Sequence, residues 1–258
     1  MPTSRLSRSV HPRDRALWYA DGMKRRDILT GTLATGAALA TAPLRAQVPA
    51  VPNSLGLRDR RLFAIAQEQL SHHGQGLWAR DVVGVVDFGL RSSDPRLHMV
   101  DFDRGVVDSY RCAHGMGSDP EHDGWLNWFS NIEESWCTSK GAYMTFGWYT
   151  GKFGTSIRLE GREPSNSNAL RRAIVMHRAA YCEPAHLERY GRLGRSNGCF
   201  AMSDADFKLA LLRLAGGRLL YADKLGIGPN GEHVTEPPKD LVPLVPEGAP
   251  QPPNPGAF

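Results

Sequence analysis

The spacing of apolar and polar residues predicts a mainly β chain with a few helices packed around it. Apolar residues recur at helical spacing over 58–72 and stop before Gly74, which predicts an amphipathic helix. Ser203, followed by two early acidic residues, is a typical N-cap and predicts a helix that ends before Gly216 and Gly217. Strand-like apolar runs fall at 82–88, 97–102, 106–112, 141–148, 155–159, 173–177 and 217–221.

Composition divides the chain into four parts. Residues 1–46 form a leader, and residues 47–57 form a linker with two prolines. Residues 58–225 are long enough for one domain with an ample core, and Asp-Arg-Gly at 103–105 predicts a hairpin turn within it. Residues 226–258 are Pro-rich and have no periodic pattern, so we expect a disordered or loosely attached tail.

The leader carries the features of an export signal. Met23 is followed by the twin arginines Arg25 and Arg26 and by a mild apolar stretch over 30–42 that is too short to span a bilayer. This order is typical of bacterial twin-arginine signals, with cleavage near Ala46. We therefore expect translation to start at Met23 and the mature protein to be periplasmic, and a basic cytoplasmic tail is the alternative.

Removing this leader changes the charge balance of the chain. The whole sequence holds 31 Lys and Arg residues against 27 Asp and Glu residues. Residues 1–46 contain eight of the basic and three of the acidic residues, which leaves 23 basic and 24 acidic residues and a net charge of −1 in the remainder. We therefore expect neither a nucleic-acid partner nor a stable membrane span.

A cysteine and a histidine supply the candidate chemistry. Cys199 follows Gly198 at the start of an apolar segment, and His177 ends a separate apolar run over 173–176. Thiol acyl transfer needs a thiolate that attacks a carbonyl, an imidazole that takes and returns the proton, and backbone N–H groups that stabilise the oxyanion. On residue types alone, a buried structural cysteine and a core histidine are the alternative.

The order of motifs around these two residues resembles the L,D-transpeptidase catalytic domain. The resemblance runs from about Asp81 to Asp223 and is strongest to the bacterial subgroup with a Ser-x-Gly-Cys signature, here Ser196 to Cys199. Several motifs in the same order are far more specific than any one of them. The motifs are Ala-His-Gly-Met-Gly-Ser at 113–118, Phe-Ser-Asn at 129–131, Lys-Gly-Ala-Tyr at 140–143, and the runs at 149–161, 166–177 and 191–199.

The resemblance implies a β-sandwich-like fold and acyl transfer on peptidoglycan stem peptides. It implies that Cys199 is the nucleophile, that His177 is the general base and later acid, and that Ser196 shapes the site. The backbone around Gly198 and Cys199 would supply oxyanion donors. The thioester would give a crosslink in a transpeptidase or a hydrolysed stem in an L,D-carboxypeptidase. The same residues also fit a catalytically silent peptidoglycan-binding module or a general cysteine peptidase.

Two positions depart from the better-known members of that family. Those members have a histidine two residues before the cysteine and an arginine two residues after it, whereas this sequence has Asn197 and Ala201. The missing arginine removes a cation that lowers a thiol pKa or holds a carboxylate. Arg195, Arg178 or Arg158 is the candidate substitute. The residues that we expect to contact substrate are Arg195, Asn197, His114, Tyr143 and Arg158.

The remaining cysteines and histidines do not predict a metal site. Cys112, Cys137 and Cys182 either stay as structural thiols or include one disulfide, because an exported protein permits both. The sequence has no Cys-x-x-Cys or His-x-x-x-His spacing, and the loop at 118–123 is more typical of a turn than of a cation site. We expect no metal and no cofactor. The oligomeric state stays open, and a monomer is assumed.

Overall fold

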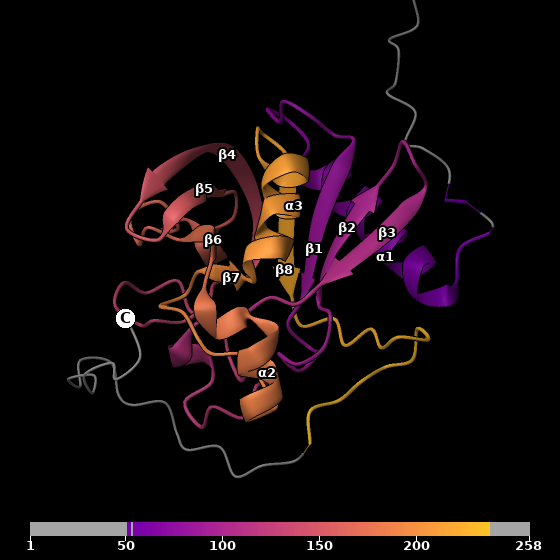
Figure 1. The fold of residues 1–258 in the computed structure, drawn as a ribbon. Coiled ribbons are helices and arrows are strands. Elements are labelled where there is room, and N and C mark those ends of the chain that lie inside the picture. The colour runs from indigo at the N-terminus through magenta and orange to yellow at the C-terminus, as the bar shows by residue number, and fades with distance from the viewer. Residues whose placement is uncertain (1–50, 53, 238–258) are drawn as a thin grey trace, which may run out of the picture. The chain divides into compact units, whose positions relative to one another are not determined.

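An eight-stranded sheet forms the framework of the protein (Figure 1). The computed structural model describes residues 51–52 and 54–237, so the predicted leader and the end of the predicted tail lie outside the described residues. The strands follow one another across the sheet in the order β3-β2-β1-β8-β4-β5-β6-β7. They are β1 (Val82–Asp87), β2 (Leu97–Asp101), β3 (Val106–Tyr110), β4 (Gly141–Gly151), β5 (Gly154–Gly161), β6 (Val175–Arg178), β7 (Phe200–Met202) and β8 (Leu219–Asp223).

The strand pairing is mixed. β1 pairs with β8 and β6 pairs with β7 in parallel, whereas the other neighbouring strands are antiparallel. β8 joins the first three strands to the last four, so the backbone hydrogen bonds run through one continuous, curled sheet. The predicted mainly β fold with a few helices is therefore confirmed.

Helices cover both faces of β1. Successive side chains of a strand point to opposite faces, so a strand covered on both sides is apolar throughout. Val83 clusters with the buried face of α1 (Leu57–His73), whereas Val82 clusters with α3 (Asp204–Leu214). The other helical elements are α2 (Pro184–Tyr190), η1 (Met116–Ser118), η2 (Pro164–Asn166) and η3 (Ala180–Cys182). Within the described residues, no helix combines the length and the apolar composition that crossing a membrane requires.

Local signals in the sequence account for most element boundaries. Ser203 caps α3 by accepting the Asp206 N–H at 3.2 Å, as predicted. The predicted turn at 103–105 connects the antiparallel strands β2 and β3. The strand predicted to begin at Ala173 begins instead at Val175, because Ala173 has a φ of +53° and lies outside the extended region.

Residues 226–237, the first part of the segment expected to be disordered or loosely attached, are connected to the domain by hydrogen bonds and one β-bridge. The carboxylate of Asp87, which is fully buried, accepts four backbone N–H groups. One comes from Gly89, and the others come from the three consecutive residues 225–227 at 2.7–2.8 Å. Ile227 then bridges to His233. A Pro-rich composition hides this attachment, because one distant carboxylate supplies it and no local periodicity accompanies it.

Replacing Asp87 by alanine is expected to lower the free energy of unfolding by about 4 kcal/mol. The substitution leaves four N–H groups in the interior without their charged acceptor. Urea unfolding followed by far-UV circular dichroism measures the change. Asp94→Ala is the matched control, because Asp94 is exposed and its loss should change stability by less than about 0.5 kcal/mol. Equal stability of the two variants would contradict the role assigned to Asp87.

Candidate active site

Cys199 and His177 lie on neighbouring strands at one edge of the sheet. β6 and β7 run parallel, with Met176 opposite Phe200 and His177 opposite Ala201. Met176 and Phe200 both point into the main core. Because side chains alternate between faces, His177 and Cys199, which immediately precedes β7, share the other face. The sheet thus brings together two residues that are 22 positions apart in the sequence.

The hydrogen bonds of His177 define its protonation. Its Nδ1 lies 2.9 Å from the carbonyl oxygen of Arg178, and because a carbonyl only accepts, Nδ1 carries the proton. The lone pair is therefore on Nε2. The ring stacks on Phe153 with centroids 4.5 Å apart and planes 20° apart. Burial lowers the pKa of His177 below its usual value, so the imidazole is neutral at pH 7 and can accept a proton at Nε2.

The thiol of Cys199 is held by the backbone at the start of β6. Sγ donates to the carbonyl oxygen of Ala173 at 3.6 Å, and the side chain is 6% exposed. Burial raises the pKa of Cys199 to about 11, whereas the N–H of Val175 and the charge of Arg172 act in the opposite direction. The resting thiol is therefore protonated, and it needs a base to become a nucleophile.

Ser196 fixes the loop that leads into Cys199. Its Oγ donates to the carbonyl of Cys199 at 2.6 Å and accepts the N–H of Gly198 at 3.1 Å. Its backbone N–H donates to the carbonyl of His114 at 2.9 Å. These contacts hold the loop from Ser196 to Cys199 in place. Of the backbone N–H groups around Gly198 and Cys199 that we expected to face an oxyanion, that of Gly198 is bonded to Ser196.

Gly198 has a conformation and a position that exclude a side chain. Its φ is +110°, and a Cβ there would lie 2.6 Å from the carbonyl oxygen of Cys137 and 2.9 Å from Ile174 Cδ1. The segments of Cys137 and Ile174 therefore pack directly against the backbone of Gly198.

Gly198→Ala is therefore expected to lower the free energy of unfolding by about 3 kcal/mol and to displace Cys199. Chemical denaturation measures the loss. Gly147→Ala is the control, because a Cβ on Gly147 meets nothing within 4 Å. If Gly198→Ala matched the control in stability, the close packing at this position would not be the reason for the glycine.

Two of the residues expected to contact substrate lie where substrate could reach them. Asn197 is exposed and adjoins the Gly198-Cys199 pair. Arg158 is exposed on β5, where it pairs with Val175 of β6 and shares the face of His177. Its guanidinium lies 4.5 Å from the ring centroid of Tyr149.

His114, by contrast, is a structural residue, which corrects its expected role in substrate binding. It is 1% exposed, and its Nδ1 accepts from the buried Arg96 at 2.7 Å. Arg96 can only donate, so the proton of His114 is on Nε2, which donates to Asp119 at 3.1 Å. Burial and the nearby Arg96 lower the pKa of His114 to about 4, so this histidine stays neutral and links two loops.

Tyr143 and Arg195 are also used within the protein. Tyr143 is fully buried, and its hydroxyl donates to the carbonyl of Ser139, so the substrate contact predicted for it is wrong. Arg195 donates to the carbonyl groups of Asp119 and Pro120, and these bonds fix the loop at 118–123. Family motifs point to such residues without saying whether a motif position is buried, and this explains both differences.

Sequence reasoning missed Arg172 and Phe153. Arg172 lies beside Gly198, where a Cβ would come within 3.1 Å of its Nη2 atom. Phe153 is 47% exposed at the turn between β4 and β5 and stacks on His177. Neither position carries a local signal, because both contacts join segments that are distant in the sequence.

The other cysteines are buried thiols in this structure. Cys112, Cys137 and Cys182 are free, and within the described residues no cluster of His, Cys, Asp and Glu could hold a metal ion. Asp119 in the loop at 118–123 is buried, and its carboxylate accepts the backbone N–H groups of Asp123 and Gly124, as in a structural turn.

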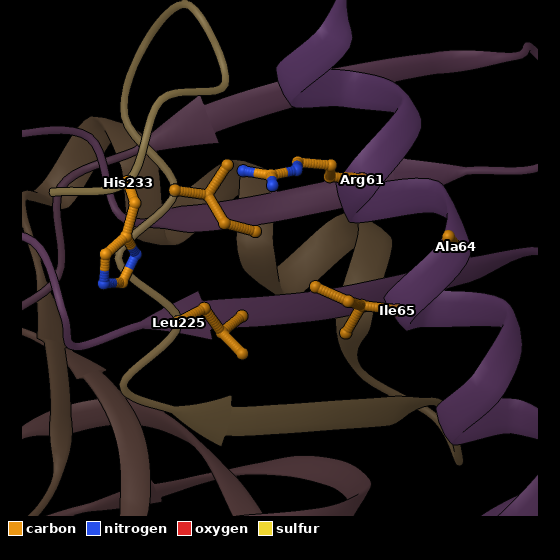
Figure 2. Close-up of a pocket in the computed structure, with 6 residues that line it drawn as sticks. Arg61, Ala64, Ile65, Leu225 and His233 are labelled. Carbon is orange, nitrogen blue, oxygen red and sulfur yellow. The ribbon is translucent and has the colours of Figure 1, made fainter.

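A hollow between α1 and the tail segment 226–237 contains none of the predicted site residues (Figure 2). Its volume is about 400 Å³, and Arg61 reaches across to the carbonyl of Gly231 at 2.6 Å. The lining residues are Arg61, Ala64, Ile65, Leu225, Ile227 and His233. The candidate chemistry therefore belongs to the β6–β7 edge and not to this hollow.

Three solved structures illustrate the likeness to known proteins. An L,D-transpeptidase from Mycobacterium tuberculosis has 16% identity and a TM-score of 0.35 over 55% of this chain and 57% of its own. An L,D-transpeptidase from Mycobacterium smegmatis has 13% identity and a TM-score of 0.34 over 55% of this chain and 58% of its own. The helical cell shape determining protein Pgp2 from Campylobacter jejuni has 14% identity and a TM-score of 0.37 over 67% of this chain and 57% of its own.

The family comparison is the one that identifies the family of this chain. The chain covers less than two thirds of each of those three structures, and no curated protein matches it. The L,D-transpeptidase catalytic domain matches residues 59–222, which is more than half of the 258 residues. The matched range contains β1 to β7 and most of β8, together with Cys199 and His177. The chain therefore belongs to the L,D-transpeptidase catalytic domain family.

Proposed function

We propose that this protein is a cysteine acyltransferase that acts on peptidoglycan stem peptides, as an L,D-transpeptidase. The observation that carries the proposal is the pairing of β6 with β7. It puts a protonated thiol and a neutral histidine with a basic Nε2 on one face of the sheet. Family membership supports the peptidoglycan substrate. The twin-arginine leader expected from the sequence would bring the domain to the periplasm, where that substrate lies.

The first step forms a thioester. His177 Nε2 takes the Sγ proton of Cys199 as the sulfur bonds to the carbonyl carbon that precedes a terminal D-amino acid. The carbonyl oxygen becomes an oxyanion, to which we assign the Cys199 N–H as donor, since Ser196 already holds that of Gly198. When the tetrahedral intermediate collapses, the C–N bond breaks and the leaving amine takes the proton from His177.

The second step resolves the thioester. An amine of a second stem attacks the thioester carbonyl, and His177 accepts the proton that the amine loses. The C–S bond then breaks, and the departing thiolate recovers that proton. The product is a crosslink between two stems. Water in place of the amine gives a free carboxylate, which is the L,D-carboxypeptidase outcome of the same intermediate.

The products formed from a disaccharide with a tetrapeptide stem test the proposal. Liquid chromatography with mass spectrometry should show a crosslinked dimer and released D-alanine. A tripeptide stem without dimer would assign the hydrolase outcome to the same site. Peptidoglycan that binds the protein but stays chemically unchanged would contradict an acyltransferase and favour the binding module.

A further inference from the structure

Arg172 is fixed beside the Gly198-Cys199 peptide by neutral acceptors. Its Nη1 donates to the carbonyl of Ser130 at 2.8 Å, and its Nη2 donates to the carbonyl of Cys137 and to Ser135 Oγ. None of these acceptors carries a charge. The nearby carboxylate of Glu133 is paired with Arg171 at 2.6 Å, and its charge acts on Arg172 without a hydrogen bond between them. An arginine side chain stays protonated in proteins. The half-buried guanidinium of Arg172 therefore carries a positive charge that no hydrogen-bonded carboxylate offsets.

The backbone of residues 172–175 contacts the thiol of Cys199 at two points. Ala173 has a φ of +53°, which is unusual for a residue with a side chain, and its carbonyl accepts from Cys199 Sγ. The N–H of Val175, two residues later, also bonds to the sulfur. The bonds of Arg172 to Ser130 and Cys137 anchor the start of this segment. One side chain thus supplies charge and also holds the backbone that contacts Sγ.

The other titratable groups around Cys199 are uncharged or turned to solvent. Burial lowers the pKa of His177 on β6 and raises the pKa values of Tyr181 in η3 and of Cys137, so all three are neutral at pH 7. Arg158 on β5 is exposed and lies against Tyr149. Arg172 is therefore the cation positioned to act on a charge at Sγ.

We propose that Arg172 is a positioning residue that stabilises the negative charge forming on Cys199 Sγ when His177 removes its proton. This inference deepens the proposed acyl transfer and rests on it for its role in the reaction. Arg172 would also replace the arginine that better-known family members have at the position of Ala201. It is not one of the three arginines that we expected to do so from the sequence. The charge reaches the site from the segment before β6 and not from the residues after the cysteine.

The alkylation of Cys199 by iodoacetamide tests this proposal without a substrate. The rate is followed from pH 7 to 12, a range that includes the pKa of about 11 of the Cys199 thiol, by mass spectrometry of the peptide that carries Cys199. In Arg172→Gln we expect the profile to move to higher pH by about one unit. The rate at pH 7 should fall only about threefold, because the less acidic thiol forms a more nucleophilic thiolate. A merely structural role predicts the opposite, since a loosened segment exposes the thiol and speeds alkylation.

Two further variants make the result decisive. Arg171→Gln is the matched control, because Arg171 is the exposed neighbour paired with Glu133, and its profile should not move. Arg172→Lys keeps the charge and should move the profile less than half as far as Arg172→Gln. If Arg172→Gln does not fold, a profile of Arg172→Lys displaced by a full unit overturns the proposal.

The outcome is separable from the fate of the proposed function. An unchanged alkylation profile in folded Arg172→Gln overturns the role of Arg172, even if the wild-type protein crosslinks stems. A displaced profile supports that role even if the wild-type protein turns over no muropeptide, in which case only the proposed reaction fails.

Discussion

Replacing Cys199 by alanine is expected to reduce the turnover of tetrapeptide-stem muropeptides at least about 1,000-fold while the sheet stays folded. Without Sγ no thioester forms, and the remaining groups have no covalent route to the product. The hydrogen bonds of the thiol to Ala173 and from Val175 are weak sulfur bonds, so the loss of stability should be about 1 kcal/mol. Product analysis by liquid chromatography measures the turnover, and thermal unfolding measures the fold.

Cys182→Ala is the control for this prediction. Cys182 is 4% exposed and packs with Leu193 and Ala201 on the face that His177 occupies, but the reaction does not use it. It should keep more than half of the wild-type turnover. Turnover by Cys199→Ala, or an equal loss in both variants, would contradict the assignment of Cys199 as the nucleophile.

His177→Gln is expected to lower kcat/KM about 1,000-fold. Cys199 is a protonated thiol at rest, so the reaction depends on the base that removes its proton, and glutamine cannot act as one. The acid limb of the wild-type pH profile should lie below pH 6.5, because burial lowers the pKa of His177 and the ring stays neutral down to that lower pH. This limb should disappear in the variant.

His72→Gln on the exposed side of α1 serves as the control for His177. It removes an imidazole without touching the β6–β7 edge, so its profile should match the wild type. A variant at His177 that keeps its kcat/KM within a factor of three, or that retains an acid limb with the same midpoint, would show that another group is the base.

The fold was predictable where it depends on local pattern. The β1 run is apolar throughout because helices cover both of its faces, and Ser203 followed by acidic residues marks the start of α3. The ordered part of the tail was not predictable, because the carboxylate of Asp87 holds it from about 140 residues away. Composition reports the absence of a repeating pattern, and it does not report a single long-range anchor.

The candidate site was predictable where a motif specifies chemistry. The structure brings Cys199 and His177 to one face, and Ser196 bonds to Gly198 and Cys199 in the loop that leads into the cysteine. The role of His114 was not predictable, because a motif does not reveal that Arg96 and Asp119 occupy both ring nitrogens. Other misses, such as the charge of Arg172, follow from contacts between distant segments.

The most direct measurement is the mass of the peptide that carries Cys199 after brief incubation with a tetrapeptide-stem muropeptide and acid quenching. The acyl-enzyme mechanism predicts an adduct on Cys199 equal to the muropeptide without its terminal D-alanine, and hydroxylamine should remove it as it does other thioesters. Turnover of the muropeptide with an adduct on a different residue, or with no adduct in rapid-quench samples through the first turnover, would contradict the mechanism.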